Sequence, residues 1–348
     1  MLLVFLILFT LPLGAQWREV ERLVEQFRAK ESAPAVSVAA SLKDGTLLTA
    51  ARGWADLENE VAATPFSMFR LASVSKPFTA VAALKLAEQG ALDLDAPVEK
   101  YVPSWPAKQW PVTVRQLLAN LGGVRHYRAD GSDFNSTVHY WSTREALAAF
   151  SSDPLLHEPG TKYLYSSYGF TLAGAAIEAA AGLPYPEAVA ALVLRPAEIE
   201  RMRADDHFAI IPGRVRGYRK TPGGEIQNCP LADTSSKTPA GGWVATAADV
   251  VRFARALLDG RLIKPESLQA MLERQRLKDG SRTSYGLGMG ILRDAAPRVY
   301  GHSGGQQGAS AYLAFSPELK TAVAVLVNLE GVNTRPLAEA ILAELQKP

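Results

Sequence analysis

The sequence is poor in the residues on which disulfide and zinc chemistry depend. Its 348 residues include one cysteine, Cys229, which excludes an internal disulfide and a cysteine-based zinc cluster. The five histidines show no metal-ligand spacing such as H-E-x-x-H, so we predict neither a metal nor an organic cofactor. Lys and Arg number 37 and Asp and Glu number 35, a balance that argues against a dedicated nucleic-acid-binding protein.

Charged side chains are also missing from the first 17 residues. Leu2 to Leu13 is an almost unbroken apolar run, shorter than the roughly 20 residues that a membrane-spanning helix needs. Small residues follow it up to Ala15. We predict a signal peptide over residues 1–15 and an exported mature protein, periplasmic or secreted. The alternative is an uncleaved N-terminal anchor, which would be the chain's one contact with a membrane.

Strand patterns lie near both ends of the chain, and helical patterns lie between them. Strands are predicted over 35–42, 46–54, 285–292, 298–302, 309–315 and 321–327. Helices are predicted over 17–30, 73–89, 246–258 and 337–345. The expected fold is therefore α/β of the α+β kind. An antiparallel sheet is built from residues 16–92 and 239–348 and flanked by helices, and a mostly helical subdomain is inserted over 93–238.

Ser73 and Lys76 form the chain's one serine–lysine pair with S-x-x-K spacing. Residues three apart on a helix are neighbours on one face. A lysine there can take the serine's proton if burial or a nearby cation suppresses its own charge. Pro77 fits only in a first turn, which places Ser73 at the helix N-terminus, where free N–H groups favour an anion. The pair is either a nucleophile with its base or a capping serine with a surface lysine.

Two further motifs contain groups that can move protons or bind a carbonyl oxygen. Tyr165-Ser166-Ser167 combines a phenol with a hydroxyl two residues on, although a second Y-x-S occurs at Tyr140. His302-Ser303-Gly304-Gly305 ends a predicted strand, where glycines let a substrate backbone approach and a backbone N–H could complete an oxyanion hole with that of Ser73. The alternatives are a packing tyrosine and a glycine-rich turn.

Taken in order, S-x-x-K, Y-x-S and H-x-G resemble the motifs of the penicillin-recognising serine hydrolases. This group includes class C β-lactamases, D,D-peptidases and their esterase relatives. The chain is most similar to the mitochondrial serine β-lactamase-like protein family and its bacterial relatives. The stretches that support this are Leu71–Ala80, Gly123–Tyr127, Asp153–Gly160, Tyr165–Phe170, Ala240–Trp243 and His302–Gly305.

The resemblance implies a β-lactamase/transpeptidase-like fold and a role for each motif residue. Ser73 would be the acylated nucleophile and Lys76 its activating base. Tyr165 would carry the proton to the leaving group and back from the attacking water.

Two site positions depart from the family pattern. Ser167 stands where relatives usually have a substrate-contacting Asn, and His302 stands where many have a Lys. We therefore expect the charge of the site to depend on pH between about 5 and 8, where an unperturbed histidine titrates. Substrate binding and the oxyanion hole would involve Ser167 together with Ser303, Gly304 and Gly305.

The sequence thus predicts a serine hydrolase that cleaves an amide or ester through a Ser73 acyl-enzyme. Its substrate would be a peptide, a D-amino-acid peptide, a β-lactam or a small ester. The alternative is a catalytically weak penicillin-binding or assembly protein that keeps the fold. His126, His139, His157 and His207 are interpreted as loop or packing residues. Self-association is left open.

Overall fold

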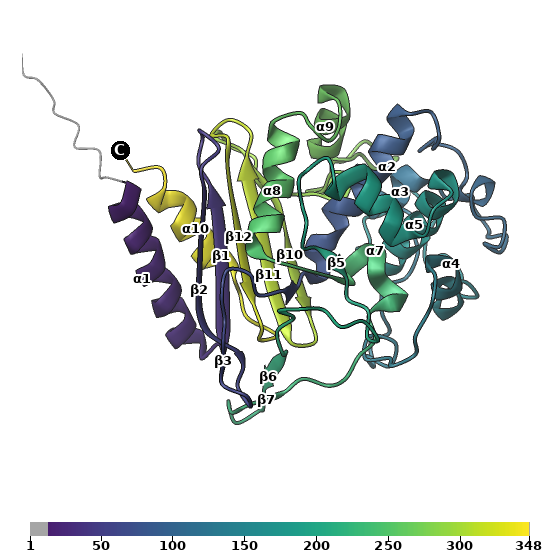
Figure 1. The fold of residues 1–348 in the computed structure, drawn as a ribbon. Helices are drawn as coiled ribbons and strands as arrows, with labels where there is room; N and C mark the ends of the chain where they lie inside the picture. Colours follow the sequence, from purple (N-terminus) through teal and green to yellow (C-terminus); the bar gives the residue numbers. More distant parts are fainter. Residues whose placement is uncertain (1–12, 348) are drawn as a thin grey trace, which may run out of the picture.

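A seven-stranded antiparallel sheet forms the centre of the computed structural model, which describes residues 13–347 (Figure 1). The strands follow the order β3-β2-β1-β12-β11-β10-β9, so both ends of the chain contribute. Their bounds are β1 (Ala35–Ser41), β2 (Leu47–Asp56), β3 (Val61–Ala62), β9 (Gly290–Arg293), β10 (Val299–Gln306), β11 (Ala309–Ser316) and β12 (Thr321–Val327). The predicted antiparallel sheet built from both termini is confirmed.

Helices cover both faces of this sheet. Helices α1 (Leu13–Glu31) and α10 (Arg335–Glu344) lie against one face, where they share an apolar cluster with the sheet valines. Helix α8 (Ala247–Leu258) packs on the opposite face against β1 and β12. These two central strands are consequently buried along their whole length and consist mostly of small and branched apolar residues, without the polar alternation of a half-exposed strand.

The remaining elements lie beyond α8, at the right of Figure 1, or at one end of the sheet. The helices are α2 (Lys76–Glu88), α3 (Val114–Leu118), α4 (Thr143–Ala146), α5 (Ser167–Ala181), α6 (Tyr185–Val189), α7 (Thr238–Gly241) and α9 (Pro265–Leu272). Shorter helical turns are η1 (Ala72–Ser75), η2 (Val98–Lys100), η3 (Leu147–Ala149), η4 (Ala190–Leu194) and η5 (Ser235–Lys237). Short strands are β4 (Phe69–Arg70), β5 (Arg203–Ala204), β6 (Tyr218–Lys220), β7 (Ile226–Asn228) and β8 (Trp243–Ala245). Within the region predicted as a helical subdomain, the helices lie mainly before residue 195, and loops with short strands occupy most of the stretch after it.

The strand expected over 285–292 is largely a turn, and β9 begins only at Gly290. Tertiary packing explains the difference. Gly288 has a φ of +67° and donates its N–H to the carbonyl of Leu118 at 2.8 Å. A Cβ at Gly288 would lie 2.6 Å from Cβ of Ala80 on α2, so the segment presses its backbone onto that helix before the chain returns to the sheet.

The predicted signal or anchor segment falls mostly on residues outside the described range. The expected cleavage point after Ala15 lies in the first turn of α1. Among the described residues, no single helix has the length and apolar character needed to cross a membrane. One pair, Ser167–Ala181 with Tyr185–Leu194, meets these criteria only jointly and is bent by 75°.

Asn328 ties three segments of the sheet together, and we expect its loss to destabilise the protein. It is fully buried, its Oδ1 accepts from the N–H of Ala35 at 2.7 Å, and its Nδ2 donates to the carbonyl of Trp54 at 3.1 Å. Asn328→Ala leaves the buried N–H of Ala35 and the partly buried carbonyl of Trp54 unpaired, so urea denaturation should show a loss of about 2–3 kcal/mol in the free energy of unfolding. Gln269→Ala, at an exposed position on α9, is the control, with an effect within about 0.5 kcal/mol. Equal effects of the two variants would contradict this role.

Candidate active site

The predicted serine–lysine pair is in contact, and the lysine is completely buried. Nζ of Lys76 lies 3.0 Å from Oγ of Ser73 and 3.2 Å from Oγ of Ser167. A third oxygen, the carbonyl of Ala240, lies 3.0 Å away. Within the described chain no carboxylate pairs with this amine. Burial, and secondarily the charge of Lys237, therefore holds the pKa of Lys76 well below its ordinary value.

Ser73 is presented by a strained turn. It lies in η1, directly before α2, and Pro77 occupies the first turn of α2 as the sequence predicts. The preceding residue, Ala72, is buried and has a φ of +46°, a left-handed conformation that costs energy for a residue with a side chain. This turn exposes Ser73 to a pocket while Lys76 stays underneath.

Tyr165 is held by backbone contacts on both sides. Both contacts are with Asn120: the N–H of Leu164 donates to its backbone carbonyl, and the N–H of Ser166 donates to its side-chain Oδ1, each at 2.9 Å. Ser166 also caps α5 through Gly169. Burial raises the pKa of the Tyr165 phenol above its ordinary value, and a hydrogen bond with Ser73 lowers it by less. Tyr165 is therefore a protonated phenol beside the Ser73 hydroxyl, and Nζ of Lys76 lies 4.8 Å from its ring centre.

His302 lies beside this group but does not face the pocket. Its Nδ1–H donates to the carbonyl of Ser303 at 2.6 Å, which leaves Nε2 to accept from the hydroxyl of Tyr285 at 2.8 Å. Both ring nitrogens are thus satisfied in the neutral form. Burial, followed by the charge of Lys76, lowers the pKa of His302 to about 3. The expectation that His302 titrates between pH 5 and 8 is wrong, because the imidazole is only 6% exposed.

The glycines after His302 bring β10 against the turn that carries Ser73. A Cβ at Gly304 would lie 2.4 Å from the carbonyl oxygen of Leu71 and 3.2 Å from the backbone nitrogen of Ser73. Only glycine permits this approach. Gly305 then lines the same pocket as Ser73, whereas the exposed Ser303 does not.

The pocket above Ser73 has a volume of about 390 Å³. It is lined by Ala72, Ser73, His126, Tyr127, Arg128, Gly131, Phe134, Tyr165, Ser167, Ala240, Gly241, Gly305 and Gln306. The structure therefore brings together Ser73, Tyr165, Ser167 and Gly305 around one cavity, with Lys76 beneath them. Two aromatic residues of the lining, Tyr127 and Phe134, were not marked as functional by the sequence patterns. Among the described residues, no group of His, Cys, Asp and Glu side chains is arranged to hold a metal ion.

His126 presents a fixed hydrogen-bond donor at this pocket. Its Nδ1 accepts from the backbone N–H of Ser167 at 3.1 Å, which places the ring proton on Nε2 in the neutral imidazole. Burial, and then the charge of Lys76, lowers the pKa of His126 to about 4. The interpretation of His126 as a loop or packing residue thus missed its place in the pocket wall, although His126 belongs to the Gly123–Tyr127 stretch that supports the family resemblance.

Lys237 is a second buried lysine behind the pocket wall. It is 2% exposed, and its Nζ lies 3.4 Å from Oε1 of Gln307 and 4.2 Å from the ring centre of Phe134. Burial, and then the charge of Arg70, lowers its pKa to about 7, although nearby aspartates oppose the shift. No sequence signal singled out this residue, but it directly precedes α7, whose Ala240 carbonyl contacts Lys76.

The amino-acid sequence matches a known protein family and several characterised proteins. A family model described as Beta-lactamase matches residues 20–346. The human mitochondrial serine beta-lactamase-like protein LACTB is 25% identical, with 93% of this chain and 79% of that protein covered. Penicillin-binding protein 4* of Bacillus subtilis (strain 168) is 27% identical over 74% of this chain and 60% of its own.

Among solved structures, the D-amino acid amidase from Ochrobactrum anthropi SV3, complexed with L-phenylalanine amide, superimposes with a TM-score of 0.81. It is 25% identical, and the match covers 95% of this chain and 99% of the amidase. The family match over nearly the whole described chain agrees with the buried serine–lysine pair and the fold around it. This chain therefore belongs to the beta-lactamase family and is an enzyme of the serine hydrolase type.

Proposed function

We propose that the protein hydrolyses an amide or ester through an acyl-enzyme on Ser73. The observation that carries the proposal is the buried amine of Lys76, which lies 3.0 Å from the Ser73 hydroxyl and has no carboxylate partner among the described residues. A neutral amine has two N–H donors and one lone pair. Two of its three neighbouring oxygens, on Ser167 and Ala240, can accept those donors, and the lone pair is then left for the proton of Ser73.

In the acylation step, Lys76 takes the Ser73 proton while Oγ forms a bond to the substrate's carbonyl carbon. The N–H groups of Ser73 and Gly305 would stabilise the resulting oxyanion. Collapse of the tetrahedral intermediate breaks the bond to the leaving amine or alcohol. Tyr165, a phenol kept protonated by burial, passes that group a proton and is reprotonated from Lys76.

Deacylation reverses these proton transfers with water in place of the leaving group. Water adds to the acyl carbon and its proton moves to the Tyr165–Lys76 pair. The bond to Oγ then breaks, and Ser73 regains its proton while the acid product leaves. Every group in this cycle returns to its starting state, so no cofactor is required.

The lining of the pocket suits a substrate whose acyl group or amine group is aromatic or apolar. Tyr127 and Phe134 form an apolar wall, and the exposed Arg128 at the rim is the one fully charged side chain among the described lining residues. The amidase neighbour acts, by its name, on D-amino acid amides, which favours small amino-acid amides and D-peptides as the first substrates to try. Export of the protein is a proposal that rests on the N-terminal segment alone, because the named relatives include a mitochondrial one.

Replacing the nucleophile should abolish turnover. Ser73→Ala removes the atom that carries the acyl group, so kcat/KM should fall by about a thousandfold or more. Lys76→Met should lose a comparable factor, and the double variant should be little worse than either single one because the two act as a unit. The assay is hydrolysis of D-phenylalanine amide and p-nitrophenyl esters, with labelling by a fluorophosphonate probe.

The matched control for the nucleophile is Ser75→Ala. Ser75 lies in the same turn, is fully buried and has no hydrogen-bond partner for its hydroxyl, so this variant should keep its labelling and activity. Wild-type-like activity in Ser73→Ala, or additive losses in the double variant, would refute the proposed mechanism. Labelling without turnover on any substrate would instead favour a binding protein that keeps the fold.

The acid side of the pH–rate profile should report on Lys76. Because the base must be neutral, kcat/KM rises as pH passes upward through the pKa of Lys76. The Lys237 cation lowers that pKa, so Lys237→Met should raise it and move the acid limb to higher pH. Lys237→Arg is the matched control, because it keeps a cation at this position and should leave the limb near its wild-type place.

His302 should not contribute to this limb. With its pKa near 3, it is neutral throughout pH 5 to 8, so His302→Gln should leave the limb where it is. A limb that disappears in His302→Gln would assign the titration to the histidine. A limb that stays in place in Lys237→Met would show that the second lysine has no electrostatic effect on the base.

The donor at Nε2 of His126 should bind the substrate's amide carbonyl, a task that Ser167 is too short to perform while it contacts Lys76. Two substitutions test the ring nitrogens one at a time. In His126→Asn the amide oxygen can replace Nδ1 as an acceptor, and in His126→Gln the amide nitrogen can replace Nε2 as a donor. His126→Asn should therefore lower kcat/KM on amides about tenfold, the effect of one hydrogen bond, whereas His126→Gln keeps most activity. Thermal stability should follow the opposite order, because only Asn can accept from Ser167. Equal kinetic losses in both variants would contradict a donor role.

A further inference from the structure

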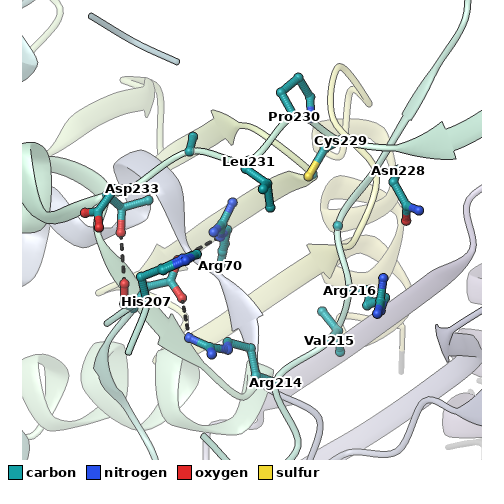
Figure 2. A pocket seen from close by; sticks show the side chains of 15 residues that line it. Arg70, His207, Arg214, Val215, Arg216, Asn228, Cys229, Pro230, Leu231 and Asp233 are labelled. Atoms are coloured by element: carbon teal, nitrogen blue, oxygen red, sulfur yellow. Dashed lines mark hydrogen bonds and ion pairs between the residues drawn. The ribbon is translucent and has the colours of Figure 1, made fainter. Parts of the chain in front are cut away.

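A second cavity, of about 410 Å³, lies away from the Ser73 pocket and shares none of its lining residues (Figure 2). It is enclosed by the loops on either side of the β6–β7 hairpin, by β4 and by the turn between β10 and β11. The side chain of Gln307 helps to separate the two spaces, because its Nε2 donates to the carbonyl of Phe134 at 2.8 Å and to Oδ1 of Asn135 at 2.7 Å.

Three guanidinium groups gather around this cavity, from Arg70, Arg214 and Arg216 (Figure 2). One buried carboxylate, Asp205, serves two of them. Its Oδ2 accepts from Nε of Arg70 at 2.7 Å and its Oδ1 accepts from Nη1 of Arg214 at 3.2 Å. Its side chain is 2% exposed, so a single negative charge is shared by two cations.

Other acids also stand around the cavity, among them Glu330, whose Oε2 accepts from the N–H of the lining residue Gly308 at 3.1 Å. Asp233, the second carboxylate of the lining, pairs with His139 at 2.7 Å. Arg216 is held at the edge by Asp56 and Glu58. Within the described chain, Nη2 of Arg70 and Nε of Arg214 have no hydrogen-bond partner, since the bonds of these two side chains all involve their other nitrogens. The cavity therefore offers free N–H donors on two guanidinium groups.

Part of the lining is apolar. It includes Val215, Pro230 and Ala232, together with Leu231, which has 76% of its surface exposed. An exposed leucine beside free arginine N–H groups suits a molecule with one charged end and one apolar end.

We propose that this cavity binds a small amphipathic anion, with a carboxylate or phosphate against Arg70 and Arg214 and a compact apolar body against Leu231. The charged end would take the free N–H donors of the two arginines, and charge-assisted bonds of this kind are roughly twice as strong as neutral ones. Its apolar end would cover the exposed leucine. The site is independent of the acyl chemistry, so it stands whether or not Ser73 is acylated.

The test is calorimetric titration of the full chain with three probes of equal tail length. Nonanoate and octyl phosphate carry the two candidate head groups, and octanol carries neither. We expect one or both anions to bind at least tenfold more tightly than octanol, and the tighter anion identifies the head group. Octanol binding as tightly as the anions, or no binding of either anion, would overturn the proposal.

Two variants locate the binding. Arg214→Gln removes a cation and should weaken the anion about tenfold. Leu231→Asp places a negative charge at the rim, on an exposed position that leaves the fold intact, and should weaken it at least as much. Arg144→Gln is the matched control, because Arg144 is exposed on α4 outside the lining and its loss should change nothing. Anion binding that survives both Arg214→Gln and Leu231→Asp would place the site elsewhere and refute the proposal.

Discussion

The burial of one amine without a counter-ion governs the architecture of the site. A charged lysine enclosed by protein, with no carboxylate beside it, would cost several kcal/mol, so the fold favours the neutral base. Neutral Lys76 still needs partners for its N–H groups, and these come from Ser167 on α5 and Ala240 on α7. Helices that lie far apart in sequence must therefore converge on the first residue of α2, and the apolar core around them keeps them there.

A second constraint is the close approach of β10 to the turn that carries Ser73. The approach requires glycine at position 304, because any side chain there would strike the backbone of Leu71. It also coincides with the left-handed conformation of Ala72, which turns the chain so that Ser73 emerges beside the strand. Strain at this point is maintained by the packing on both sides. The same geometry places the backbone of Gly305 at the pocket that Ser73 enters.

Most of the fold and the centre of the site could be predicted from local signals. The strand predicted over 321–327 has those bounds, and the helix predicted over 246–258 begins one residue later with Thr246 as its cap, because a branched apolar run and capping chemistry are each encoded within a few residues. Spacing and Pro77 likewise placed Ser73 beside Lys76. The neutral state of His302 could not be predicted, because it depends on Tyr285 from another segment. The pocket positions of Lys237 and of His126, which was interpreted as a loop or packing residue, could not be predicted for the same reason, since only tertiary packing brings them to the pocket.

The structure also shows why a histidine can stand at the third motif without adding charge to the site. Burial lowers the pKa values of Lys76, Lys237, His126 and His302, and it raises that of Tyr165. Each group is pushed toward its uncharged form, although Lys237, with a pKa of about 7, and the exposed Arg128 keep some positive charge near Ser73. In the mechanism proposed above, proton transfer makes Lys76 an ammonium while the carbonyl oxygen of the substrate becomes an oxyanion. Hydrogen-bond donors directed at that oxyanion are stronger in a buried site than they would be in water. Backbone N–H groups, which carry only partial charges, would in this way distinguish the transition state from the bound substrate.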